Sequence, residues 1–142
     1  MREPALIVHL IGVVLWVGST ATGAFTAAQL AATATGETRT VGLGVVRRVL
    51  LVLGAPGLLL AWAGGLTMLI EGWSDLYARA GWMHGKLTIG LVLAALHGVV
   101  VGRVRRAATG QREASPALMT GLAMTIVVLA LVNITLAIVR PG

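Results

Sequence analysis

Residues 82–106, WMHGKLTIGLVLAALHGVVVGRVRR, decide the fold class of this chain. An α-helix needs roughly 20 mostly apolar residues to cross a bilayer, and this stretch is long enough. It also carries His84, Lys86 and His97. Ionisable side chains in a membrane helix are costly, so they usually face the interior of a helix bundle or an interface. We therefore expect this helix to form the wall of a site as well as a membrane anchor.

The whole chain is apolar. Of its 142 residues 57% are hydrophobic and only 11% are charged, and the mean hydropathy is +0.91, well above that of soluble domains. Four segments are near or above spanning length: residues 4–30, 45–70, 82–104 and 117–139. We predict an all-α fold in which residues 1–142 form a single polytopic four-helix membrane bundle with both termini on the same side. The first segment is too long for the core of a signal peptide and is expected to be retained.

The net charge of +6 is carried by the connections between these segments, and it does not indicate nucleic-acid binding. The positive-inside rule places the more basic side in the cytoplasm, so both termini are expected outside. Cysteine is absent, which excludes disulfides, thiolate metal sites and iron–sulfur clusters. Seven arginines lie on the predicted cytoplasmic side: Arg39, Arg47, Arg48, Arg103, Arg105, Arg106 and Arg112. Four basic residues lie on the other: Arg2, Arg79, Lys86 and Arg140.

The first segment has one face that combines a histidine with small residues. Successive residues lie about 100° apart around a helix axis, and small residues allow helices to approach closely in lipid. We therefore predict that His9 and Trp16 point into the bundle. The members of this face are His9, Gly12, Val13, Trp16, Thr20, Gly23 and Ala27.

The remaining segments carry signals for turns and packing. Residues 31–44 are rich in Thr, Gly and Ala and predict a loop or a short interfacial turn. Pro56 between two glycines predicts a kink in the second helix, followed by a close-packing stripe of Gly57, Ala61, Gly64 and Met68. Ser115 and Pro116 predict the start of the fourth helix. Within that helix, Asn133 is expected to hydrogen-bond across the bundle.

His9 and His84 are predicted to lie near the same membrane boundary, because the first and third helices run in the same direction. They could supply both axial nitrogens to a haem standing between the helices, and Lys86 could pair with a porphyrin carboxylate. Alternatively, both are interfacial histidines whose polar tips reach water. His97 lies deeper, where it could bind a metal, relay protons or hydrogen-bond to Ser19 or Thr20.

Four stretches of the chain occur in the order found in one known family. They are VHLIGVVLW with His9 and Trp16, RRVLLVLGAPGLLLAWAGG with Pro56, WMHGKLTIGLVLAALH, and the ending EASPALM with the terminal VRPG. On these motifs the chain resembles, nearly end to end, the HemJ-type protoporphyrinogen IX oxidases, small four-helix proteins of the bacterial inner membrane. The WxHxKL pattern with a later histidine is the most specific of them.

The resemblance implies a haem b protein that oxidises protoporphyrinogen IX in the haem pathway and passes electrons to a membrane acceptor. It implies that His9 and His84 bind the haem iron, that Trp16 and Lys86 contact the porphyrin, and that Lys86 and His97 take part in the reaction. A homo-oligomer or a larger complex is also compatible with it. The sequence departs from the family in STATGAFTAAQL (residues 19–30), which lacks the family's arginine, and at Leu96, where a tyrosine is common.

These departures leave other functions open. A second hypothesis is a haem b electron carrier, or a membrane subunit of a larger complex, without a porphyrinogen site. A third is metal handling of the CopD type, although copper(I) prefers sulfur ligands and the chain has no cysteine. The remaining hypothesis is a helix bundle with a purely structural role.

Overall fold

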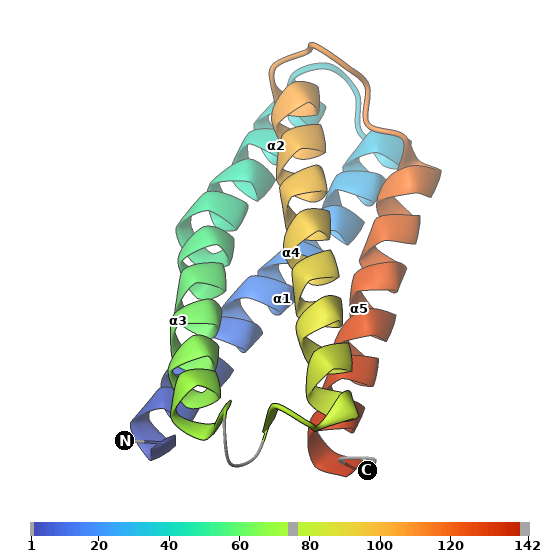
Figure 1. Ribbon diagram of the computed structural model, residues 1–142. Helices are drawn as coiled ribbons and strands as arrows, with labels where there is room; N and C mark the ends of the chain where they lie inside the picture. The colour runs from blue at the N-terminus through green and yellow to red at the C-terminus, as the bar shows by residue number, and fades with distance from the viewer. Residues whose placement is uncertain (1, 74–76, 140–142) are drawn as a thin grey trace.

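The computed structural model describes residues 2–73 and 77–139, and within these ranges the chain is helical with no strand. Four stretches are long and apolar enough to cross a membrane, which confirms the predicted four-helix membrane bundle. α1 begins and α5 ends at one end of the bundle, here called the terminal end (Figure 1). The opposite end is called the arginine end. The helices are α1 (Arg2–Thr33), α2 (Gly36–Val49), the π-helical turn η1 (Leu50–Gly54), α3 (Ala55–Gly72), α4 (Gly81–Ala108) and α5 (Pro116–Val139).

The second span begins earlier than the sequence indicated, because residues 36–44 are helical rather than a loop. The chain reverses direction directly after α1, where Gly36 adopts a φ of 55° that suits glycine. The side chain of Arg39 then donates hydrogen bonds to the carbonyls of Ala34 at 2.7 Å and Ala31 at 3.2 Å, which closes the end of α1. Leu43 is buried in the core. These tertiary contacts stabilise helix in a segment of low intrinsic propensity.

The kink predicted at Pro56 coincides with an irregular turn of helix. η1 immediately precedes α3, and the N–H of Ala55 donates to the carbonyl of Leu50, five residues back. Proline has no N–H to give, and π-type turns inside α-helices accommodate such interruptions. α2, η1 and α3 thus form one continuous but interrupted span, Gly36–Gly72.

α1 packs against α3 through residues that have little or no side chain. A Cβ atom at Gly57 would lie 2.6 Å from the nitrogen of Trp16, so only glycine allows this approach. Gly57, Ala61 and Gly64 of the predicted stripe are all buried. The face of α1 predicted to point inward does so, since its members Gly12, Trp16, Thr20, Gly23 and Ala27 are buried and His9 and Val13 are half-buried.

The helices form two pairs that meet at the arginine end and separate toward the terminal end. α1 packs against α3 and, toward the arginine end, against α5, which also packs against α4, whereas the backbones of α3 and α4 stay apart (Figure 1). The fully buried part of the core lies in the arginine half, where α2 packs against α4 and α1 against α5. Its largest members are Leu43, Leu50, Val100, Val104, Met119 and Ile126.

Candidate functional site

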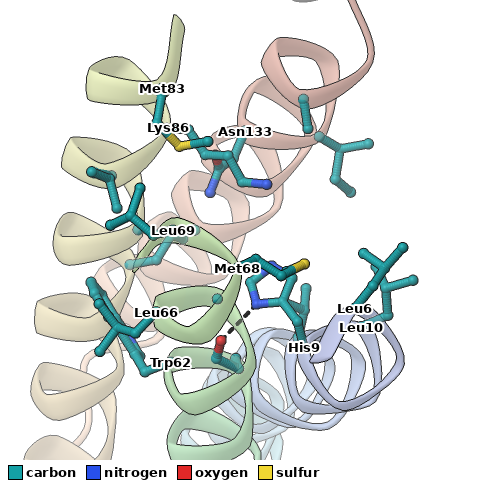
Figure 2. Close-up of a pocket in the computed structure, with 18 of the residues that line it drawn as sticks. Leu6, His9, Leu10, Trp62, Leu66, Met68, Leu69, Met83, Lys86 and Asn133 are labelled. Carbon is teal, nitrogen blue, oxygen red and sulfur yellow. Dashed lines mark hydrogen bonds between the residues drawn. The ribbon is translucent and has the colours of Figure 1, made fainter. Parts of the chain in front are cut away.

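A cavity of about 670 Å³ lies between the two helix pairs, in the terminal half of the bundle. α1, α3, α4 and α5 all contribute to its wall, which is mostly aliphatic and aromatic with a few polar groups (Figure 2). Its volume is in the range of about 300–1,000 Å³ that is typical of small-molecule sites. Besides the indoles of Trp16, Trp62 and Trp82, the polar or ionisable side chains on the wall are those of Glu3, His9, Tyr77, Lys86 and Asn133.

His9 is held in a defined orientation on this wall. Its Nδ1 lies 2.6 Å from the carbonyl oxygen of Ala61 on α3, and since a carbonyl only accepts, Nδ1 carries the hydrogen (Figure 2). The neutral ring therefore has a lone pair on Nε2. Gly65 lies beside the ring, because a Cβ there would be 3.0 Å from Nδ1. The close α1–α3 packing thus fixes both the position and the tautomer of His9.

Lys86 and Trp16 line the same cavity, as expected if they serve the same ligand. Trp16 is only 5% exposed, so its indole closes the inner end of the cavity. Lys86 projects from α4, one helical turn after Trp82, and is half-buried. The structure therefore brings three of the five predicted site residues, His9, Trp16 and Lys86, to one cavity.

His84 is not among the residues that line this cavity. It is exposed, and its Nδ1 donates to the carbonyl of Ala80 at 3.0 Å, one turn back on its own helix. Its ring packs edge-on against Trp73, with ring centroids 6.2 Å apart. The predicted pairing of His84 with His9 is therefore not visible in the cavity wall, and the two-histidine ligand set stays a prediction.

His97 belongs to a separate polar cluster at the point where the helix pairs diverge. The ring is 5% exposed, and its Nδ1 donates to the hydroxyl of Thr20 at 2.8 Å. That hydroxyl in turn donates to the carbonyl of Trp16 at 2.6 Å. The ring also fits against Gly54, where a Cβ would lie 2.9 Å from its Cε1. Of the roles left open for His97, the structure contains the hydrogen bond to Thr20.

Some cavity residues were not singled out from the sequence. Trp62, Gly65 and Leu69 form a stripe on α3 next to the small residues that pack against α1. Their spacing of three and four residues is the helical signal that could have revealed them. Asn133 lines the cavity, and its Oδ1 is buried with no hydrogen-bond partner among the described residues, so this oxygen does not accept the predicted hydrogen bond.

Comparison with models of protein families, with curated proteins and with solved structures finds no match for this chain. Residues 2–73 and 77–139 contain no group of three or more His, Cys, Asp or Glu side chains placed to hold a metal ion. The functional interpretation therefore depends on the cavity and on the residues that line it.

Proposed function

We propose that this chain is a membrane haem b protein of the oxidoreductase class, whose cavity binds a porphyrin and whose His9 binds the iron. The observation that carries the proposal is the 2.6 Å hydrogen bond from His9 Nδ1 to the Ala61 carbonyl. Histidines that bind metals usually donate their other ring N–H to a carbonyl or carboxylate, which fixes the tautomer and makes the ligand more basic. His9 has this arrangement, and it lines a cavity of suitable size.

A porphyrin metal fits this wall better than a bare metal ion. A porphyrin supplies the equatorial ligands itself, so one or two axial side chains are enough to hold the iron. A bare ion needs several protein ligands, and the described residues offer no group of three. This observation favours haem over the CopD-like alternative, and finding copper in place of iron in the purified protein would reverse that preference.

The polar groups on the wall suggest how a porphyrin would be oriented. Lys86 places a cationic group on α4, and charge-assisted hydrogen bonds of this kind bind carboxylates well. Tyr77 and Trp82, whose rings meet edge-on with centroids 5.9 Å apart, line the cavity near the terminal end. Such aromatic residues are typical of the membrane interface. The carboxylate edge would then face the membrane surface and the apolar ring would lie deeper.

Haem b, when bound, supplies one-electron redox chemistry. This chain would hold it through His9, orient its carboxylates through Lys86 and exclude water from its inner end through Trp16. In the form suggested by the resemblance, the protein would oxidise protoporphyrinogen IX and pass the electrons to an acceptor in the membrane.

The optical spectrum of the purified protein tests haem binding. We expect a b-type band in the reduced-minus-oxidised spectrum and iron in a fixed ratio to protein, both lost in His9→Ala. Wild-type protein that is folded but has neither the band nor iron would contradict the proposal.

A haem b electron carrier without oxidase activity is the second candidate. The cavity volume of about 670 Å³ corresponds to a site for a single ligand, so a resident haem would leave little room for porphyrinogen beside it. Expression in a strain that lacks protoporphyrinogen oxidase separates the two functions. Rescue of growth supports the oxidase, and failure of rescue by protein with normal haem content supports the carrier.

We also propose the orientation in the bacterial inner membrane that the charge distribution predicts, with the arginine end in the cytoplasm. Its support is that Arg39, at the start of α2, bonds carbonyls at the end of α1, and that Arg105 and Arg106 lie in the last turn of α4, so these three arginines lie at the arginine end. Alkaline phosphatase fused to the C-terminus should be active, and a fluorescent reporter that folds only in the cytoplasm should be dark there. The reverse result would contradict this orientation.

A further inference from the structure

The cavity is bordered on one side by exposed apolar side chains. Leu6 and Leu10 on α1, with Ile134 and Ile138 on α5, all line it, yet they are between 45% and 74% exposed. A residue that lines a cavity and is also this exposed lies at its opening. We call the opening edged by these four residues the α1–α5 slot.

The slot lies within the membrane. All four residues belong to spans, Glu3–Thr33 and Pro116–Val139; Leu10 and Ile134 lie more than one helical turn inside the span ends, where acyl chains are the neighbouring groups in a bilayer, and Leu6 and Ile138 lie nearer the headgroups. α1 and α5 are in contact toward the arginine end, where Ala24 and Ala28 share a buried cluster with Met119 and Ala123. Toward the terminal end α1 runs to α3 instead (Figure 1). The divergence of the two helices therefore opens the cavity sideways toward lipid.

The opposite side, between α3 and α4, is more closed. The indole of Trp62 reaches from α3 toward α4 and lies 3.9 Å from the position that a Cβ of Gly90 would occupy. Among the cavity-lining residues of α3 and α4, only Leu66 is strongly exposed. Figure 2 shows Trp62 and Leu66 on this side, and Leu6 and Leu10 on the other.

We infer that the cavity exchanges its ligand directly with the bilayer through the α1–α5 slot. The inference rests on the proposed porphyrin site and adds a route and a physical class of ligand, an amphiphile with a flat apolar body and anionic groups at one edge. The four residues that edge the slot are aliphatic, so the apolar body of the ligand can pass between them without stripping water from a polar side chain. The charged edge stays near the headgroups, where Lys86, Tyr77 and Trp82 line the cavity. Such a ligand is taken from the membrane and returned to it without crossing water.

A slot-filling double variant, Leu10→Phe with Ile134→Phe, tests the route. Its matched control is Val14→Phe with Leu131→Phe, which adds the same side chains to the same helices at exposed positions outside the cavity wall. Each protein is placed in nanodiscs and mixed with vesicles that contain protoporphyrin IX. Loading is followed by the loss of tryptophan fluorescence through energy transfer to the porphyrin.

We expect the control to load at the wild-type rate and the slot-filling variant to load about tenfold more slowly, to a similar final occupancy. Equal loading rates in the two double variants would overturn the inference. Wild-type protein that takes up no porphyrin would instead contradict the proposed function. A second measurement then tests whether the α1–α5 slot is open to lipid.

That measurement needs no porphyrin. Trp16 becomes the sole indole when Trp62, Trp73 and Trp82 are changed to Phe, which keeps an aromatic ring at position 62 on the α3–α4 side, and phospholipids with brominated acyl chains quench a nearby indole. In ligand-free protein we expect brominated lipid to quench Trp16 with the native slot and with the control pair, and to quench it less with the slot-filling pair. Equal quenching in all three would show that acyl chains do not reach the cavity by this route.

Discussion

Gly64 on α3 faces the backbone of His9 on α1 so closely that a Cβ at position 64 would lie 2.7 Å from the His9 nitrogen. The same Cβ would lie 2.5 Å from the carbonyl oxygen of Ala5. Backbone atoms cannot turn aside as a flexible side chain can, so the helices meet here only because this residue is glycine. This contact also brings His9 within hydrogen-bond distance of Ala61. Helix packing and the candidate ligand therefore depend on the same few atoms.

Gly64→Ala should destabilise the protein by about 1–3 kcal/mol, because the added methyl group forces α1 and α3 apart. Thermal unfolding in detergent, followed by circular dichroism, measures the loss. Gly18→Ala is the matched control, since a Cβ at Gly18 meets nothing within 4 Å. Gly18→Ala should leave the stability of the protein unchanged or raise it by up to about 1 kcal/mol. Similar melting temperatures for the two variants would show that the close approach at Gly64 is not required.

His9→Ala should abolish haem retention, whereas His84→Ala should keep most of it, because only His9 lines the cavity. The measurement is the ratio of Soret absorbance to protein after purification, with circular dichroism as the control for folding. Loss of haem in His84→Ala, from a protein that remains helical, would instead support the two-histidine ligand set predicted from the sequence.

The number of spans and the inward face of α1 could be predicted because lipid imposes simple rules. A span needs a long apolar segment, and close helix packing in lipid needs small residues. Gly12, Trp16, Thr20 and Gly23 satisfy the second rule and are buried. The start of α2 could not be predicted in this way. Its glycines and threonines resemble a loop, and tertiary contacts such as the Arg39 hydrogen bonds make it helical.

The direction in which His84 points could not be predicted from the sequence. Spacing along a helix gives the height of a side chain, and it puts His84 only two residues from Lys86. The direction of each side chain depends on how the helix is rotated and tilted against its neighbours, which spacing does not supply. In the structure Lys86 lines the cavity and His84 packs on Trp73 outside it. Two residues in one motif therefore have different surroundings.

Thr20→Val should destabilise the protein by about 1–3 kcal/mol, because valine keeps the shape but leaves the buried Nδ1–H of His97 without an acceptor. Thr20→Ser should recover most of the loss, since it restores the hydroxyl. Thr22→Val is the control, as the Thr22 hydroxyl is exposed and bonds only within its own helix, so the expected change is within about 0.5 kcal/mol. Equal effects of the two valine substitutions on the melting temperature would contradict a role for the His97–Thr20 hydrogen bond.

Asn133→Leu should stabilise the ligand-free protein. The Oδ1 of Asn133 is buried with no hydrogen-bond partner among the described residues, and an unsatisfied buried polar group costs about 1–3 kcal/mol. Leucine has a similar volume and no polar atom, so the substitution removes this cost while it keeps the packing between α5 and the cavity. Thermal unfolding of protein purified without porphyrin measures the gain. The control is Thr135→Val, which removes an exposed hydroxyl bonded within α5 and should change stability by less than about 0.5 kcal/mol. A lower melting temperature for Asn133→Leu than for the control would mean that the amide makes a stabilising contact in the folded protein.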